Sequence, residues 1–205
     1  VWGPQEEHHG VVLDTLSQRL GMPPTEANTG DVAPRVRVLG ALAHLPVVHE
    51  VIRLMYYLTG AATEKSAMLA YRAMSEGLGE MGEHAVRRTV VDAIKVQEPG
   101  HFAFYKLSAE HLVRSGALSP WQLHLARLLR SRTFSLVGAG TREQRAGFGG
   151  VVVELGLEAD IERNVRDITR LESQLLWAQQ KGMEVPAYAL AAFRDAASLY
   201  RERAG

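Results

Sequence analysis

Two copies of the pattern Glu-x-x-His bring a carboxylate and an imidazole within reach of one another. The first copy contains Glu6 and His9, and the second contains Glu98 and His101. Residues three apart are neighbours on a helix surface, so each pair can direct both groups toward one point. The chain has no cysteine, and any bound metal must therefore be held by His, Asp or Glu. The two pairs predict such a metal site.

A lone carboxylate, Glu64, lies between the two motifs, in the middle of a long predicted helix. It follows Glu6 by 58 residues and precedes Glu98 by 34 residues. Two helices of about 15 residues joined by a turn return to the same height, so Glu64 can face the second motif inside a bundle. Two-metal sites in helix bundles use a Glu from each of two helices and Glu-x-x-His from each of two others. The sequence thus supplies five of these six ligands, namely Glu6, His9, Glu64, Glu98 and His101.

One Glu-x-x-His match alone is a weak signal, because charged residues at helical spacing are common on solvated faces. The combination with Glu64, and the aromatic Phe102, Phe104 and Tyr105 beside the second motif, favour an inward-facing site. The other histidines are interpreted as surface or core residues, namely His8, His44, His49, His84, His111 and His124. We also expect a solvated helix face to carry Arg127, Arg130 and Arg132.

The composition is that of a globular protein. Of the 205 residues, 46% are hydrophobic and 22% are charged, which suits a single domain spanning 1–205. The formal net charge is +0, which argues against general nucleic-acid binding because phosphate binding needs a surplus of cations. No apolar run reaches the roughly 18 residues that a membrane span needs.

The hydrophobic pattern is helical almost throughout and predicts an all-α bundle. Pro46 and the pair Ser119-Pro120 are typical helix starts, and a loop is expected at 23–34. The predicted helices are 6–20, 36–43, 46–76, 83–115, 120 to about 138, 157–180 and 186–203. Residues 1–115 would form the metal-binding bundle and 116–205 the C-terminal helices; the stretch 151–153 is read as helix or loop. Pro99, inside the fourth of these helices, predicts a kink or a π-type distortion.

The segment 1–115 resembles the soluble acyl-acyl-carrier-protein desaturases. Residues 2–10, Trp-Gly-Pro-Gln-Glu-Glu-His-His-Gly, look like the second bundle helix of that family. Thr63-Glu64-Lys65 looks like the third-helix ligand, and 97–101, Gln-Glu-Pro-Gly-His, like the fourth-helix pair. Because residue 1 leads at once into an amphipathic pattern, we expect a first bundle helix with the sixth ligand to precede it.

The resemblance implies a ferritin-like bundle with additional C-terminal helices, usually a cytoplasmic homodimer. It implies a cofactor of two iron ions, with manganese as an alternative. It also implies O₂, a ferredoxin-type electron donor and an acyl chain carried on acyl carrier protein. Glu64 and Glu98 would bridge the metals, with one histidine on each iron and Glu6 completing one side.

Three further positions surround the implied site: Trp2, Ala67 and Gln97. Gln97 would orient His9, but the family has Asp there, and an amide carries no negative charge. Ala67 replaces a family threonine, with Ser66 adjacent. These departures keep two alternatives to desaturation open. One is a di-iron oxygenase or oxidase acting on another substrate. The other is a catalytically inactive ferritin-like binding protein, suggested by the Pro99-Gly100 insertion and the missing sixth ligand.

Overall fold

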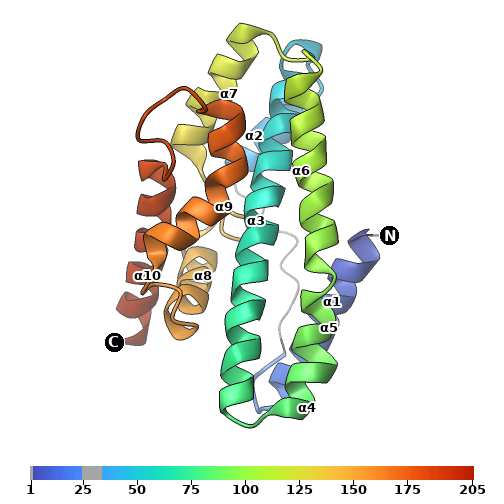
Figure 1. Ribbon diagram of the computed structural model, residues 1–205, viewed down its shortest axis with the longest axis vertical. Helices are drawn as coiled ribbons and strands as arrows, with labels where there is room; N and C mark the ends of the chain where they lie inside the picture. The colour runs from blue at the N-terminus through green and yellow to red at the C-terminus, as the bar shows by residue number, and fades with distance from the viewer. Residues whose placement is uncertain (1, 25–33) are drawn as a thin grey trace.

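The computed structural model describes residues 2–24 and 34–205, and throughout these ranges the regular secondary structure is helical (Figure 1). This confirms the predicted all-α bundle. The helices are α1 (Trp2–Arg19), α2 (Pro34–Leu42), α3 (Pro46–Glu80), α4 (His84–Val86), η1 (Arg87–Val91), α5 (Asp92–Lys95), α6 (Glu98–Arg114), α7 (Pro120–Thr133), α8 (Arg142–Glu154), α9 (Ile161–Leu176) and α10 (Ala187–Ala204). Most of the loop predicted for 23–34 lies outside the described residues. None of the described helices combines the length and hydropathy of a membrane span.

The 35-residue helix α3 is the axis of the molecule. Pro46 stands in its first turn, as predicted, where a missing backbone N–H costs nothing. Helix α6 runs antiparallel beside α3, and α7 and α9 pack on the other sides of α3 (Figure 1). Gly60 allows α3 and α6 to approach closely, because a Cβ there would lie 2.3 Å from the ring of Tyr105. The α3–α6 pair is therefore firmly packed one turn from Glu64.

The single helix predicted for 83–115 is in fact several segments. A π-helical turn, η1, leads into the short α5, and the chain is interrupted at Val96 and Gln97 before α6 begins at Glu98. Pro99 consequently lies in the first turn of α6, a position that tolerates proline, instead of distorting a helix interior. The predicted kink at Pro99 is thus replaced by a helix end and a new start, and the π-type turn occurs earlier in the chain.

Two hydrophobic clusters form the core. One joins α3 and α6 to α7 and α9, through residues that include Leu54, Leu58 and Leu171. The other joins α8, α9 and α10, through residues that include Val152 and Phe193. Helices α8 and α10 touch along their backbones, since a Cβ at Gly149 would lie 1.9 Å from the carbonyl oxygen of Ala196. The stretch 151–153 is part of α8, in agreement with the helical interpretation.

A buried ion pair joins these clusters and corrects one prediction. Arg130, expected on a solvated face, is 0% exposed, and its Nε donates to Glu172 Oε2 at 2.7 Å. Its Nη1 also donates to Thr59 Oγ1 at 3.0 Å, and Tyr188 donates to the other oxygen of Glu172. The network therefore links α7, α9, α3 and α10.

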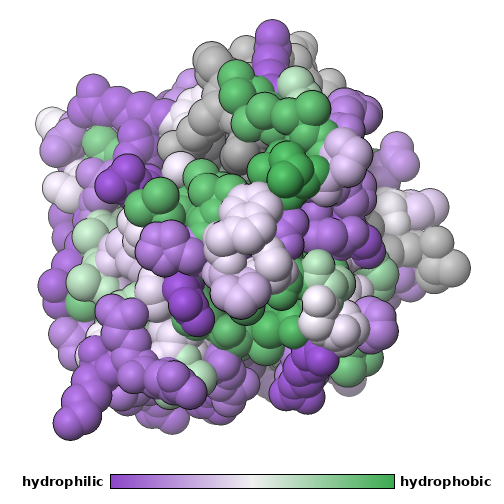
Figure 2. All heavy atoms as spheres, turned by 90° about the horizontal axis from the view of Figure 1, so that it is seen from above, coloured by the Kyte–Doolittle hydropathy of each residue, from purple (hydrophilic) through white to green (hydrophobic). Residues whose placement is uncertain are grey.

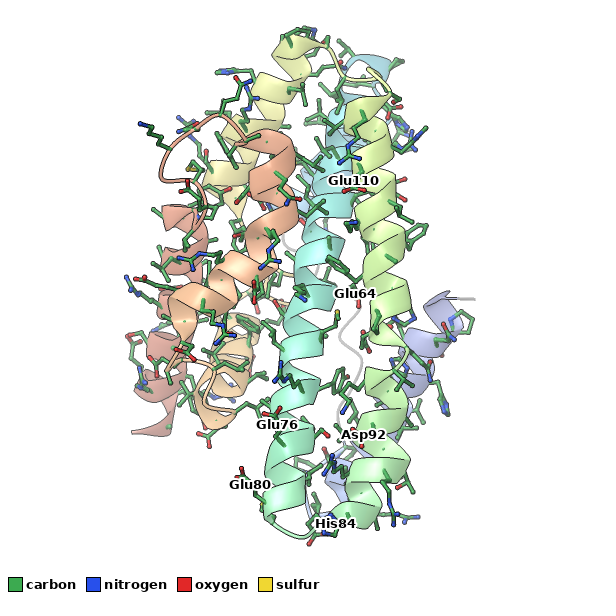
Figure 3. All side chains as sticks on the ribbon, in the orientation of Figure 1. Glu64, Glu76, Glu80, His84, Asp92 and Glu110 are labelled. Atoms are coloured by element: carbon green, nitrogen blue, oxygen red, sulfur yellow. The ribbon has the colours of Figure 1, made fainter. Side chains whose placement is uncertain are left out.

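Exposed apolar side chains gather at one end of the molecule, where α2 ends and α3 and α7 begin (Figure 2). They are Leu42, Leu45, Val47 and Trp121. This end lies away from the middle of α3, where Glu64 is placed (Figure 3). The apolar surface and the predicted metal ligands are therefore separate features of the molecule.

Candidate metal centre

Three helices bring the five predicted ligands together. Helix α3 supplies Glu64, which Figure 3 shows on the side that faces α6. The first turn of α6 supplies Glu98 and His101, and α1 supplies Glu6 and His9. Ligand atoms of Glu6, Glu64, Glu98 and His101 all lie within 4.8 Å of one another. His9 Nδ1 lies 3.5 Å from an oxygen of Glu6 and 3.5 Å from an oxygen of Glu98.

The cluster is buried, which distinguishes it from charged residues on a solvated helix face. The exposed fractions are 4% for His9, 6% for Glu64, 2% for Glu98 and 5% for His101, while the Glu6 side chain is 39% exposed. Charged side chains are rarely this buried unless they are paired or bind metal. Three carboxylates and two imidazoles in one buried volume therefore indicate a binding role.

The carboxyl groups of the cluster are crowded together, which disfavours their ionised forms unless a positive charge lies nearby. Burial, a hydrogen bond with Glu98 and the charges of Glu6 and Glu98 raise the pKa of Glu64 to about 8. Burial and the charge of Glu98 also raise the pKa of Glu6. Tyr71 is affected as well: burial and the charges of the three carboxylates raise its pKa to about 12. A bound cation would reverse these effects, because it favours the ionised form of each carboxyl group.

The distances show which carboxylates lie between the histidines. His101 Nδ1 is 2.7 Å from Glu6 Oε1 and 3.7 Å from Glu98 Oε2. Because His9 Nδ1 is also within 3.5 Å of both residues, Glu6 and Glu98 are each shared by the two imidazoles. Glu6 and Glu98 are therefore the two carboxylates that lie beside both imidazoles. Glu64 belongs to the same 4.8 Å group and forms a hydrogen bond with Glu98, and the expectation that Glu64 and Glu98 bridge the metals stays a prediction.

Unpartnered atoms show that these residues fit a metal. Glu6 Oε1 and His9 Nδ1 are buried and make no hydrogen bond of normal geometry within the described part of the chain, although His101 Nδ1 approaches Glu6 Oε1 to 2.7 Å. Leaving such a buried group unsatisfied costs about 1–3 kcal/mol. Both atoms are of the kind that bind metal, and they lie 3.5 Å apart. Three carboxylates and two imidazoles form a donor set suited to a pair of iron or manganese ions.

Two glutamine side chains lie within hydrogen-bond distance of the Nε2 atoms of the two imidazoles. His9 Nε2 lies 3.2 Å from Gln97 Oε1, and His101 Nε2 lies 3.2 Å from Gln5 Oε1. Gln97 is the residue that the resemblance implied for orienting His9. Gln5 was not predicted, although it precedes Glu6 just as Gln97 precedes Glu98. Comparing the residue before each motif would have revealed it.

The remaining positions near the site have plainer roles. Ser66 does not substitute for the hydroxyl that Ala67 lacks, because its Oγ donates to the carbonyl of Ala62 at 2.8 Å. Ser66 instead lines a small cavity of about 20 Å³ together with residues of α8 and α9, such as Phe148 and Ile168. The side chain of Trp2 lies outside the described part of the structure. All six other histidines are exposed.

Comparison of the chain with protein-family models, with curated proteins and with solved structures found no match.

Proposed function

We propose that this chain holds a dinuclear metal centre and, with iron bound, catalyses O₂-dependent desaturation of an acyl chain carried on acyl carrier protein. The observation that carries the proposal is the buried convergence of both Glu-x-x-His pairs with Glu64. The resemblance of residues 1–115 to the acyl-carrier-protein desaturases supports the substrate class. The same resemblance supports a cytoplasmic homodimer.

In this proposal all five predicted ligands belong to the centre. Glu6, His9, Glu64, Glu98 and His101 would together hold the metal ions, and Glu6 and Glu98 are the carboxylates that lie beside both imidazoles. Glu64 would lose its proton on metal loading, because ligating carboxylates are ionised. When bound, the metal pair would supply redox chemistry in which O₂ is reduced to two waters: the acyl chain gives up two vicinal hydrogens with their two electrons, and a ferredoxin-type donor supplies two further electrons, with two protons taken from solution.

Burial of the ligands serves this chemistry. The four most enclosed ligands are at most 6% exposed, so water has little access to the reacting groups. Exclusion of water strengthens electrostatic interactions in a site and limits side reactions. The chain's own contribution is thus to hold the donors, fix the imidazole rings and keep the centre dry.

A second candidate function keeps the metal centre and changes the reaction to oxidation or oxygenation of another substrate. The observations that favour it are the missing hydroxyl at Ala67, which Ser66 does not replace, and the neutral amide of Gln97 beside His9. Product analysis distinguishes the two. Desaturation lowers the mass of an acyl chain by two hydrogens, whereas oxygenation raises it by one oxygen.

Metal content tests the proposal first. The full chain, purified from iron-replete cells, should hold about two irons, as expected for a dinuclear bundle site. The Glu98→Ala variant should lose most of this iron, because Glu98 lies between both imidazoles. A matched control is Glu110→Ala on the same helix, since Glu110 pairs with Lys106 and Arg114 away from the cluster. Less than about one iron in the wild type, or unchanged iron in Glu98→Ala, would instead favour a binding protein without turnover.

A further inference from the structure

The structure assigns Gln5 as the positioning residue of His101 and pairs it with Gln97 in a crosswise clamp, so that each Glu-x-x-His motif orients the histidine of the other. This inference deepens the proposed metal centre and rests on it. Gln5 belongs to α1 but holds an imidazole of α6, and Gln97 directly precedes α6 but holds an imidazole of α1. The residue before the carboxylate of each Glu-x-x-His motif therefore acts across the site.

The hydrogen bonds fix which ring nitrogen faces the carboxylates. An amide oxygen only accepts, so the histidine nitrogen that it contacts must carry the proton. For Gln97 the amide cannot easily turn over, because its Nε2 donates to the carbonyl of Ala93 at 3.2 Å. Gln97 thereby holds His9 as the Nε2–H tautomer with Nδ1 toward Glu6 and Glu98, and the inferred role of Gln5 gives His101 the same tautomer, with its Nδ1 2.7 Å from Glu6. Such outer hydrogen bonds commonly set the ring orientation of metal-binding histidines.

The clamp also explains why amides occupy these positions. The cluster already contains three carboxylates whose ligand atoms lie within 4.8 Å of one another and of His101. A carboxylate behind each ring would add negative charge to this volume. Glutamine oxygens accept the same hydrogen bonds without adding charge.

The crosswise arrangement makes a prediction that a merely local role for the glutamines would not. Removing Gln5 from α1 should release a ring on α6, and removing Gln97 should release a ring on α1. NMR of the full chain labelled with ¹⁵N-histidine, titrated with Zn²⁺ as a diamagnetic probe, observes each ring separately. In the wild-type complex both His9 and His101 should show a slowly exchanging Nε2–H proton.

Gln5→Ala should abolish the slowly exchanging proton of His101 alone, and Gln97→Ala that of His9 alone. Each variant should bind Zn²⁺ about 10–100-fold more weakly, the usual cost of losing an outer hydrogen-bond partner. Gln5→Glu keeps an accepting oxygen and should restore the His101 proton. Gln18→Ala is the matched control, because Gln18 lies on the same helix and its Nε2 donates to Asp14 in an exposed hydrogen bond.

Two results would overturn the clamp. If Gln5→Ala binds Zn²⁺ and keeps the His101 proton, or loses that of His9, the crosswise assignment is wrong while the metal centre stands. If wild-type chain binds no Zn²⁺, the metal centre fails and the clamp fails with it. Unchanged thermal unfolding of Gln5→Ala, compared with Gln18→Ala, separates these results from a loss of the fold.

Discussion

Replacing Glu64 by Gln in the metal-free chain should stabilise the fold, although it removes a proposed ligand. Glu64 is 6% exposed and lies beside two other carboxylates, so its ionised form is unfavourable. Its pKa is raised from 4.5 to about 8. A glutamine has nearly the same shape and can still donate a hydrogen bond to Glu98, but it never acquires the charge.

The magnitude follows from the shift in pKa. One pKa unit corresponds to about 1.4 kcal/mol, so a rise from 4.5 to about 8 represents at most roughly 4–5 kcal/mol. Part of the rise comes from the hydrogen bond with Glu98, which glutamine preserves, and we expect a gain of about 2 kcal/mol in alkaline solution.

The sign of the pH dependence is fixed by proton binding. Between pH 4.5 and about 8 the folded chain binds more protons at Glu64 than the unfolded chain does. The free energy of unfolding of the wild type should therefore fall as pH rises through this window. Below about pH 4.5 the carboxyl is protonated in both states, and the advantage of Glu64→Gln should vanish.

Urea unfolding followed by circular dichroism, in the presence of a chelator and across this pH range, measures the difference. Glu76→Gln is the matched control, because Glu76 lies on the same helix and is exposed in an ion pair with Arg72. Its effect should be small, since surface ion pairs contribute little. A difference between wild type and Glu64→Gln that does not grow with pH would refute the argument that carboxylate crowding strains this site.

Two further predictions concern the scaffold. Arg130→Met should lower the free energy of unfolding by about 3–5 kcal/mol, because it leaves the 2%-exposed Glu172 without its cation. Adding Glu172→Leu should recover much of this loss. Urea unfolding of the single and double variants tests this, and equal stability of the single variant and the wild type would contradict it. Gly149→Ala should cost about 1–3 kcal/mol, because its Cβ would lie 1.9 Å from the Ala196 carbonyl oxygen. Gly147→Ala on the same helix has open space and should instead stabilise by up to about 1 kcal/mol. Thermal unfolding compares the two, and a matching response would show that α8 and α10 are not in backbone contact.

Local signals explain what could be predicted from the sequence. Proline in a first turn located the starts of α3 and α7, and the three-residue spacing of the motifs placed each carboxylate beside its histidine. Glu64 was found because the helical repeat determines how far an antiparallel helix must run to return to the same height.

What escaped prediction depends on distant contacts. The burial of Arg130 comes from Glu172, which is 42 residues away in the chain, and no local pattern announces such a partner. The helix break before Glu98 was missed because Pro99 is compatible with both a kink and a new helix start. Gln5 does carry a local signal, since it precedes Glu6 as Gln97 precedes Glu98, but its partner His101 lies 96 residues away in the chain.

Helix α1 supplies Glu6 and His9, yet its backbone makes only sparse contacts with the other described helices. The α3–α6 pair, by contrast, holds Glu64, Glu98 and His101 in place by extensive packing. Three of the five proposed ligands are therefore positioned without α1, and the other two depend on the docking of α1. If metal binds as proposed, any molecules with α1 undocked would lower the apparent affinity by their share of the population, and metal binding would favour the docked state. Substitutions that weaken the packing of α1 would then weaken metal binding without altering a ligand.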